Sequence, residues 1–256
     1  MGRYPSLRLL VIRLAASGLF ALAWPAQAGE VRVAVAANFA GPFQKIAADF
    51  AAATGHTAVP ITGSTGKFYA QITSGAPFDV LLAADEKIPR QLEDEGLAVR
   101  GQRFTYARGR LVLWSARAGY VDGSGEVLRK GTFAHLALAD PTLAPYGAAA
   151  VQTLKALGVY DAIAPRMVQG ENITQTQQFI ASGNAELGFL ALSQVMVPGQ
   201  PARGSWWVVP ATLYDPIRQD AVLLKKGEGN VAASALLQYL RSDRARAVIL
   251  SHGYEL

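Results

Sequence analysis

Glycines, hydroxyls and a lysine come together in the segment GSTGK at residues 63–67, an arrangement that suggests a phosphate-binding turn. A nucleotide loop of the Walker type has the pattern G-x-x-x-x-G-K-[ST], in which the first glycine forms the turn and the last hydroxyl binds magnesium. Ile61 stands at the position of that first glycine and Phe68 at that of the last hydroxyl, so the nucleotide motif is absent. The turn, with Ser64 and Thr65, precedes a predicted helix. It fits either an oxyanion bound by free N–H groups at the helix start or an ordinary helix cap.

Other catalytic chemistry finds little support along the chain. The sequence has no H-E-x-x-H, G-x-S-x-G, S-x-x-K or paired-carboxylate motif, and it has no cysteine to act as a nucleophile or thiolate ligand. His56 follows a predicted helix end, His135 precedes an apolar strand and His252 lies near the C-terminus, where structural roles are expected. An exported hydrolase using Ser64 or Thr65 would need a base beside it, and none is near in sequence. We therefore predict a binding protein and no enzyme, with the hydrolase as the alternative.

Polar or small residues also follow three other predicted strands. Asn38 follows the first strand, Tyr146 lies in DPTLAPYG and Ile173 lies in GENITQ. Each of these turns, taken alone, is better explained as a helix cap. Ligands of open α/β sheets bind at the carboxyl ends of the strands, so four such turns on matching edges predict one shared site.

Strand and helix patterns alternate around these turns. Apolar runs at 30–38, 56–62 and 78–84 predict strands, with Pro60 at a sheet edge, and a helical spacing of apolar residues ends at Gly55. Such alternation predicts an α/β fold with a mostly parallel sheet.

Two long extended segments, at 103–116 and 215–227, lie far apart in the sequence and predict the connections between two lobes. We predict a first lobe of residues 29–108 and 217–256, and a second, inserted lobe of residues 109–216. The ligand cleft is expected between them, with a hinge at the connections.

The N-terminus has the features of an export signal. Three arginines and the apolar run at 14–25 precede Ala-Gln-Ala at 26–28, so residues 1–28 are predicted to be a cleaved signal peptide and the protein to be periplasmic. The run is shorter than the roughly 20 residues of a membrane-spanning helix. The leader takes three of the 24 basic residues and none of the 19 acidic ones, which leaves 21 against 19. The high pI is therefore no argument for nucleic-acid binding.

The order of several segments resembles that of the periplasmic molybdate-binding proteins of ABC importers, over essentially the whole mature chain. These segments are VAANF, GSTGKFYAQITSGAPFDVLLAADEK, RFTYARGRLVLWS, ADPTLAPYG, GENI, AELGFLAL and SHGY. The resemblance implies the type II periplasmic-binding-protein fold and a monomer without a cofactor. It also implies that molybdate or tungstate is bound between the lobes and delivered to a membrane permease with a cytoplasmic ATPase.

Carried over residue by residue, the resemblance implies four ligand residues. The side-chain ligands fall on the amide of Asn38 and the hydroxyl of Thr65, and the backbone donors fall on Tyr146 and Ile173. These groups would hold molybdenum as its oxyanion, with no direct metal ligand. Lys67 is expected on the surface, outside the site.

Two departures from the family leave the exact donor set open. Some relatives carry a tyrosine where this chain has Ala191, and others carry a second hydroxyl where it has Ala37. The hydroxyl of Tyr146 is a candidate to replace the donor missing at Ala191, and a water molecule is the alternative.

The chemistry of a neutral donor set agrees with this implication. N–H groups, hydroxyls and helix starts can hold a tetrahedral dianion without a Lys or Arg counter-ion. Phosphate retains a proton near neutral pH and needs an acceptor, and an organic carboxylate would call for an arginine clamp, which the four turns lack. Sulfate differs from molybdate chiefly in size, so binding of another oxyanion such as sulfate stays open, as does the choice between molybdate and tungstate.

Overall fold

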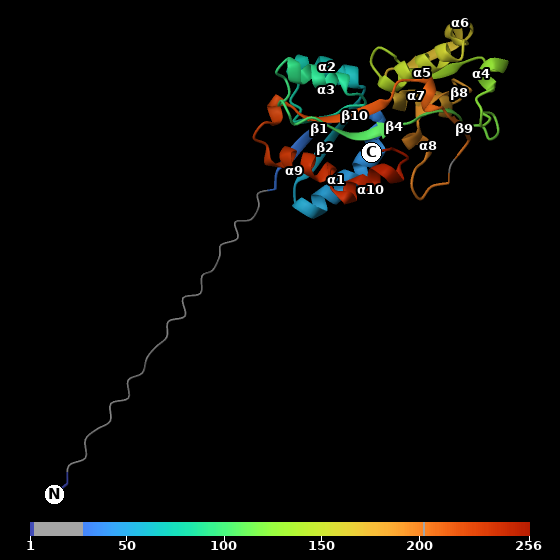
Figure 1. The fold of residues 1–256 in the computed structure, drawn as a ribbon. Helices are drawn as coiled ribbons and strands as arrows, with labels where there is room; N and C mark the ends of the chain where they lie inside the picture. Colours follow the sequence, from blue (N-terminus) through green and yellow to red (C-terminus); the bar gives the residue numbers. More distant parts are fainter. Residues whose placement is uncertain (3–27, 202) are drawn as a thin grey trace.

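Two five-stranded sheets form the described part of the chain, which in this computed structural model comprises residues 1–2, 28–201 and 203–256. Figure 1 shows them as two lobes side by side, each with helices packed on its sheet. This arrangement confirms the predicted α/β fold with two lobes.

The sheet of the first lobe has the strand order β2-β1-β3-β10-β4. Its strands are β1 (Glu30–Ala36), β2 (Thr57–Gly63), β3 (Val80–Leu82), β4 (Phe104–Gly109) and β10 (Ile217–Leu223). Its helices are α1 (Ala40–Thr54), α2 (Thr65–Thr73), α3 (Lys87–Asp94), α9 (Val231–Leu240) and α10 (Asp243–Ser251). As predicted, Gly55 ends α1, in the left-handed conformation that glycine adopts without strain (φ 73°), and Pro60 lies in the edge strand β2.

The sheet of the second lobe has the order β7-β6-β8-β5-β9. Its strands are β5 (Leu111–Ser115), β6 (Leu136–Ala139), β7 (Met167–Gly170), β8 (Leu187–Ala191) and β9 (Ser205–Val208). Its helices are α4 (Val127–Lys130), α5 (Pro145–Ala156), α6 (Tyr160–Ile163), α7 (Ile173–Ala181) and α8 (Leu192–Val195). Short 3₁₀ turns lie at η1 (Ala37–Phe39), η2 (Ala164–Arg166), η3 (Ala211–Leu213) and η4 (Lys225–Gly227).

One strand in each sheet runs against the others. β10 is antiparallel to both β3 and β4, and β5 is antiparallel to both β8 and β9. These are the strands by which the chain enters a lobe from the other one, so they run away from the cleft, whereas the remaining strands run toward it. The prediction of a mostly parallel sheet is thus correct for the direction of most strands. The reversed strands β5 and β10 nevertheless make half of the strand pairings antiparallel.

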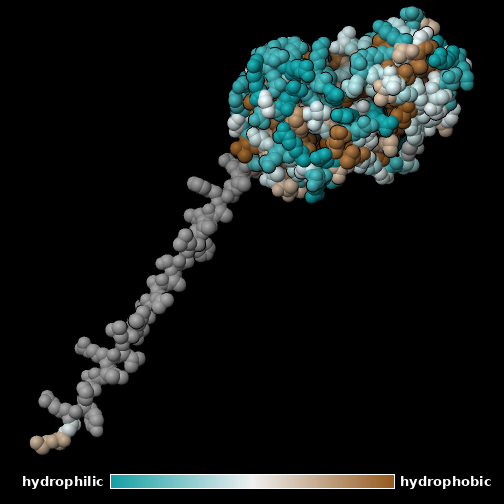
Figure 2. All heavy atoms as spheres, in the orientation of Figure 1, coloured by the Kyte–Doolittle hydropathy of each residue, from teal (hydrophilic) through white to brown (hydrophobic). Residues whose placement is uncertain are grey.

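Apolar side chains cover both faces of the first sheet. One buried cluster packs α1, α9 and α10 against it, and a second packs α2 and α3 against the opposite face, as the ribbon shows. The core of the second lobe extends to Ala36, Ala37 and Ala84 of the first, so the two lobes are packed together at the cleft. Figure 2 shows hydrophilic residues over most of the visible face, with apolar patches near the junction of the lobes.

The predicted signal peptide, residues 1–28, falls almost entirely on residues outside the described part and stays a prediction. Within the described residues, none of the helices combines the length and apolarity needed to cross a membrane.

Candidate ligand-binding site

A cavity of about 10 Å³ lies between the lobes where the four predicted turns meet. This volume is near the smallest that can hold one water molecule, so the lobes are closely apposed. Its lining residues come from both lobes, and those described are all uncharged: Ala36, Ala37, Asn38, Gly63, Ser64, Thr65, Ala84, Ala144, Pro145, Tyr146, Asn172 and Ile173. The structure therefore brings together all four residues that the sequence predicted for the site.

Asn38 lies in η1, directly after β1, and is buried. Its Nδ2 donates to Gln219 Oε1 (2.9 Å) and to the Tyr254 hydroxyl (3.0 Å). Both amide hydrogens thus have protein partners, which differs from the expectation of an amide ligand. The donor that Asn38 leaves for an anion is its backbone N–H, in the first turn of the short helix, where N–H groups lack intrahelical acceptors.

Ser64 and Thr65 begin α2 with two different hydroxyls. Thr65 Oγ1 accepts a hydrogen bond from the N–H of Ala84 (3.0 Å), which leaves the hydroxyl hydrogen free to donate. Ser64 Oγ is buried and has no hydrogen-bond partner among the described residues. A buried polar atom without a partner is costly, so this hydroxyl is a strong candidate ligand. The sequence placed Ser64 in the turn but gave no signal to prefer it over Thr65.

Tyr146 supplies the first N–H of α5. Pro145, which opens the helix, has no N–H, and the N–H groups of Gly147 and Ala148 donate to Ala144 O. The phenol oxygen of Tyr146 accepts a hydrogen bond from Gln219 Nε2 (3.1 Å).

The idea that the Tyr146 hydroxyl replaces the donor missing at Ala191 stays a prediction, because a hydroxyl that accepts from Gln219 keeps its own hydrogen to donate. Ala191 itself is buried and is not among the residues that line the cavity.

Ile173 supplies the corresponding donor of α7. The capping residue Asn172 accepts through Oδ1 from the N–H groups of Thr174 (3.0 Å) and Gln175 (3.1 Å). The N–H of Ile173, in the same first turn, does not donate to this capping side chain and is therefore the donor that α7 offers to a ligand. Three helix starts, those of α2, α5 and α7, therefore point positive potential at one uncharged cavity, an arrangement suited to an anion.

Charged groups stand outside this cavity. Lys67 Nζ pairs with Glu171 Oε2 across the two lobes (2.5 Å), and both side chains are partly exposed. Gly66 N donates to Leu143 O across the same junction (2.9 Å), and a Cβ on Gly66 would lie 3.0 Å from Leu143 Cα, so glycine permits this close approach.

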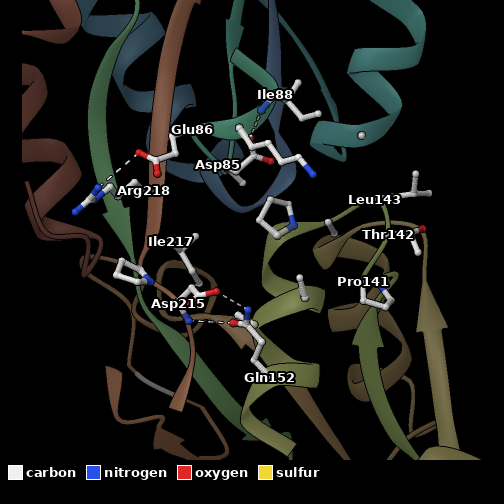
Figure 3. Close-up of a pocket in the computed structure, with 18 residues that line it drawn as sticks. Asp85, Glu86, Ile88, Pro141, Thr142, Leu143, Gln152, Asp215, Ile217 and Arg218 are labelled. Carbon is white, nitrogen blue, oxygen red and sulfur yellow. Dashed lines mark hydrogen bonds and ion pairs between the residues drawn. The ribbon is translucent and has the colours of Figure 1, made fainter. Parts of the chain in front are cut away.

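A larger pocket of about 400 Å³ lies beside β10, and it shares Ala84, Ala144 and Pro145 with the ligand cavity. Figure 3 shows Asp85 and Glu86 on one side and Thr142 and Leu143 on the other. Burial raises the pKa of Asp85 to about 6, against hydrogen bonds from the N–H groups of Ile88 and Lys87, and the charge of Asp220 adds to the rise. The described residues hold no cluster of three or more His, Cys, Asp or Glu side chains able to bind a metal ion.

The sequence model of one protein family, the bacterial extracellular solute-binding proteins, matches residues 31–255 of this chain. The chain belongs to this family. A protein of Azotobacter vinelandii named molybdate-binding protein ModA is 56% identical to this chain, and the match covers 98% of each of the two chains. The ModA of Rhodobacter capsulatus is 51% identical over 91% of both chains.

A solved structure agrees with these relatives. The periplasmic molybdate-binding protein of Azotobacter vinelandii superposes with a TM-score of 0.86 at 42% identity, covering 88% of this chain and 99% of that one. The predicted type II binding-protein fold of this solute-binding protein is thereby confirmed.

Proposed function

We propose that the protein captures molybdate, or tungstate, in the cavity between its lobes and delivers it to an ABC importer. In this proposal it is exported to the periplasm, acts as a monomer and hands the anion to a membrane permease driven by a cytoplasmic ATPase. It acts by binding, without catalysis.

The observation that carries the proposal is the unpartnered hydroxyl of Ser64 beside three converging helix starts. The available groups at this cavity are donors: the hydroxyls of Ser64 and Thr65 and the backbone N–H groups of Asn38, Tyr146 and Ile173. A fully deprotonated tetrahedral dianion accepts from all of them, whereas monohydrogen phosphate also needs an acceptor. The names of the relatives supply the particular anion.

Two alternatives are set against this proposal. Sulfate is also a fully deprotonated dianion that accepts hydrogen bonds from all of these donors. The size of the cavity must therefore discriminate between sulfate and molybdate. A hydrolase using Ser64 or Thr65 would need a general base in reach, and the described residues lining the cavity include no His, Asp, Glu or Lys.

The test is a thermal-shift panel of the mature protein with molybdate, tungstate, sulfate and phosphate at equal concentration. A ligand at 100 times its Kd adds about 2.7 kcal/mol to the free energy of unfolding. We expect a rise in melting temperature with molybdate and tungstate and none with sulfate or phosphate. Equal stabilisation by sulfate would reject size selection, and no response to any oxyanion would reject the proposal.

Export is tested separately. N-terminal sequencing of periplasmic material is expected to begin at Gly29, after Ala-Gln-Ala. An intact N-terminus in the membrane fraction would contradict cleavage.

A further inference from the structure

A buried hydrogen-bond network lies behind the ligand cavity. Its centre is Gln219 in β10, which is fully buried. Gln219 Oε1 accepts from Asn38 Nδ2 (2.9 Å) and from the Tyr106 hydroxyl (3.1 Å), and Gln219 Nε2 donates to the Tyr146 hydroxyl (3.1 Å). Burial raises the pKa of both of these phenols well above its usual range, so they keep their protons at neutral pH.

Gln219 thereby joins a ligand turn of one lobe to a ligand turn of the other. Asn38 follows β1 in the first sheet, and Tyr146 begins α5 on the second. A second hydrogen bond joins the lobes beside it, because Ser193 Oγ of α8 donates to Asn38 O (2.9 Å). The hydroxyl of Tyr254, within the first lobe, donates to the same oxygen (2.8 Å).

The position of Gln219 is fixed within the first lobe. The register between β10 and β4 shifts between Gln219 and Asp220, and such a bulge re-aims the side chains beside it. Asp220 is held by Arg103 Nη1 (2.5 Å) and by Thr105 Oγ1 (2.7 Å). The amide of Gln219 therefore approaches Tyr146 from a rigid support.

Gly109, at the end of β4, leaves room for this contact. A Cβ there would lie 2.0 Å from the Tyr146 hydroxyl and 2.6 Å from Gln219 Nε2. The connection from the first lobe to the second, at Gly109, thus passes in direct contact with the hydrogen bond between Gln219 and Tyr146.

We propose that Gln219 is a positioning residue for anion binding, which holds the ligand turns of Asn38 and Tyr146 in the closed arrangement through its two amide ends. This proposal rests on the proposed function for the identity of the ligand. Gln219 does not touch the anion. It sets how often the lobes are closed and how well their N–H groups converge.

The test compares two phenol deletions on the same glutamine. Tyr146→Phe removes the bond between the lobes and keeps the ring and the backbone N–H. Tyr106→Phe is the matched control, because Tyr106 bonds Gln219 and Ala83 O (3.0 Å), both within the first lobe. The chain lacks cysteine, so spin labels on Gln71→Cys and Gln178→Cys, exposed positions in α2 and α7, report the distance between the lobes.

We expect Tyr146→Phe to weaken molybdate binding about five- to tenfold in calorimetry, as loss of one hydrogen bond and an unpaired amide predict. Its distance distribution without molybdate should shift to longer values. Tyr106→Phe should change affinity less than about twofold and leave the distances unchanged, with a comparable loss of stability.

Equal effects of the two variants on affinity and distance, or wild-type behaviour of Tyr146→Phe, would overturn the role of Gln219. Failure of the wild-type protein to bind molybdate would instead reject the proposed function. The distances without ligand would then still decide whether Gln219 holds the lobes together.

Discussion

The two sides of the cleft present different kinds of donor. The first lobe contributes the hydroxyls of Ser64 and Thr65 beside the N–H of Asn38, whereas the donors of the second lobe are the N–H groups of Tyr146 and Ile173. A hydroxyl can be deleted by one substitution that leaves the backbone in place. A backbone donor depends on where a helix begins, so it tolerates changes of its own side chain and is sensitive to its neighbours.

Moving the start of α5 should have the largest effect. In Gly147→Ala the added Cβ would lie 2.0 Å from Ala139 O, a backbone atom, so the first turn with the N–H of Tyr146 must shift. We expect molybdate affinity to fall about a hundredfold or more. A hydrogen bond to a charged group contributes about 1.5 to 3 kcal/mol, and the shifted turn would also no longer direct its N–H toward the ligand. Titration calorimetry measures this.

The control is Gly41→Ala in α1, where a Cβ meets no atom of the described residues within 4 Å. It should bind like the wild type. A folded Gly147→Ala protein with unchanged affinity would show that this helix start does not hold the ligand.

Deleting one hydroxyl of the first lobe should have a smaller effect with a distinctive pattern. Ser64→Ala is expected to lose about 1.5 to 3 kcal/mol of binding free energy while the ligand-free protein keeps or gains stability, because the hydroxyl has no partner in the described part of the chain. Thr65→Ala should lose stability as well, since the buried N–H of Ala84 would lose its acceptor.

Denaturation with and without molybdate separates these two outcomes. Thr62→Val, at an exposed hydroxyl of β2, is the control. Equal destabilisation of the free protein by Ser64→Ala and Thr65→Ala would contradict the assignment of Ser64 as the unpartnered hydroxyl.

The first lobe also brings a carboxyl close to the cleft, and it should make stability depend on pH. The folded pKa of Asp85, about 6, exceeds its ordinary value of 3.8, so its contribution to stability is complete below pH 3.8 and is lost as pH rises through 6. Relative to Asp85→Asn, the wild type should lose about 2 kcal/mol between pH 4 and pH 6. Urea denaturation across this range is the measurement, and parallel pH profiles of the two proteins would contradict it.

The exposed contact between the lobes should matter least. A double-mutant cycle of Lys67→Gln and Glu171→Gln is expected to give a coupling below about 1 kcal/mol in molybdate binding, because both side chains are partly exposed. The coupling should vanish at 1 M salt. A larger, salt-resistant value would place this pair among the principal determinants of closure.

The site residues that the sequence could predict are those that directly follow predicted strands. Alternating strands and helices put Asn38, Thr65, Tyr146 and Ile173 at carboxyl ends of strands, and the structure brings them to one cavity. The reversed strands β5 and β10 could not be read from apolar patterns, which are the same for either strand direction.

The network around Gln219 was beyond local patterns. Gln219 lies 181 residues from Asn38 and 73 from Tyr146, and its direction depends on a register shift between β10 and β4. The choice between Ser64 and Thr65 likewise depended on which hydroxyl the N–H of Ala84 reaches.

The uncharged lining of the cavity has a consequence for proton linkage. Hydroxyls and backbone N–H groups do not titrate near neutral pH, so the binding of a dianion by them should neither take up nor release protons. At pH 8, above the pKa of Asp85, the heat of binding should therefore be the same in Tris as in HEPES, although these buffers differ in their enthalpy of ionisation. The affinity of such a site is set by geometry, and it should hold across the range of pH in which the anion itself stays fully deprotonated.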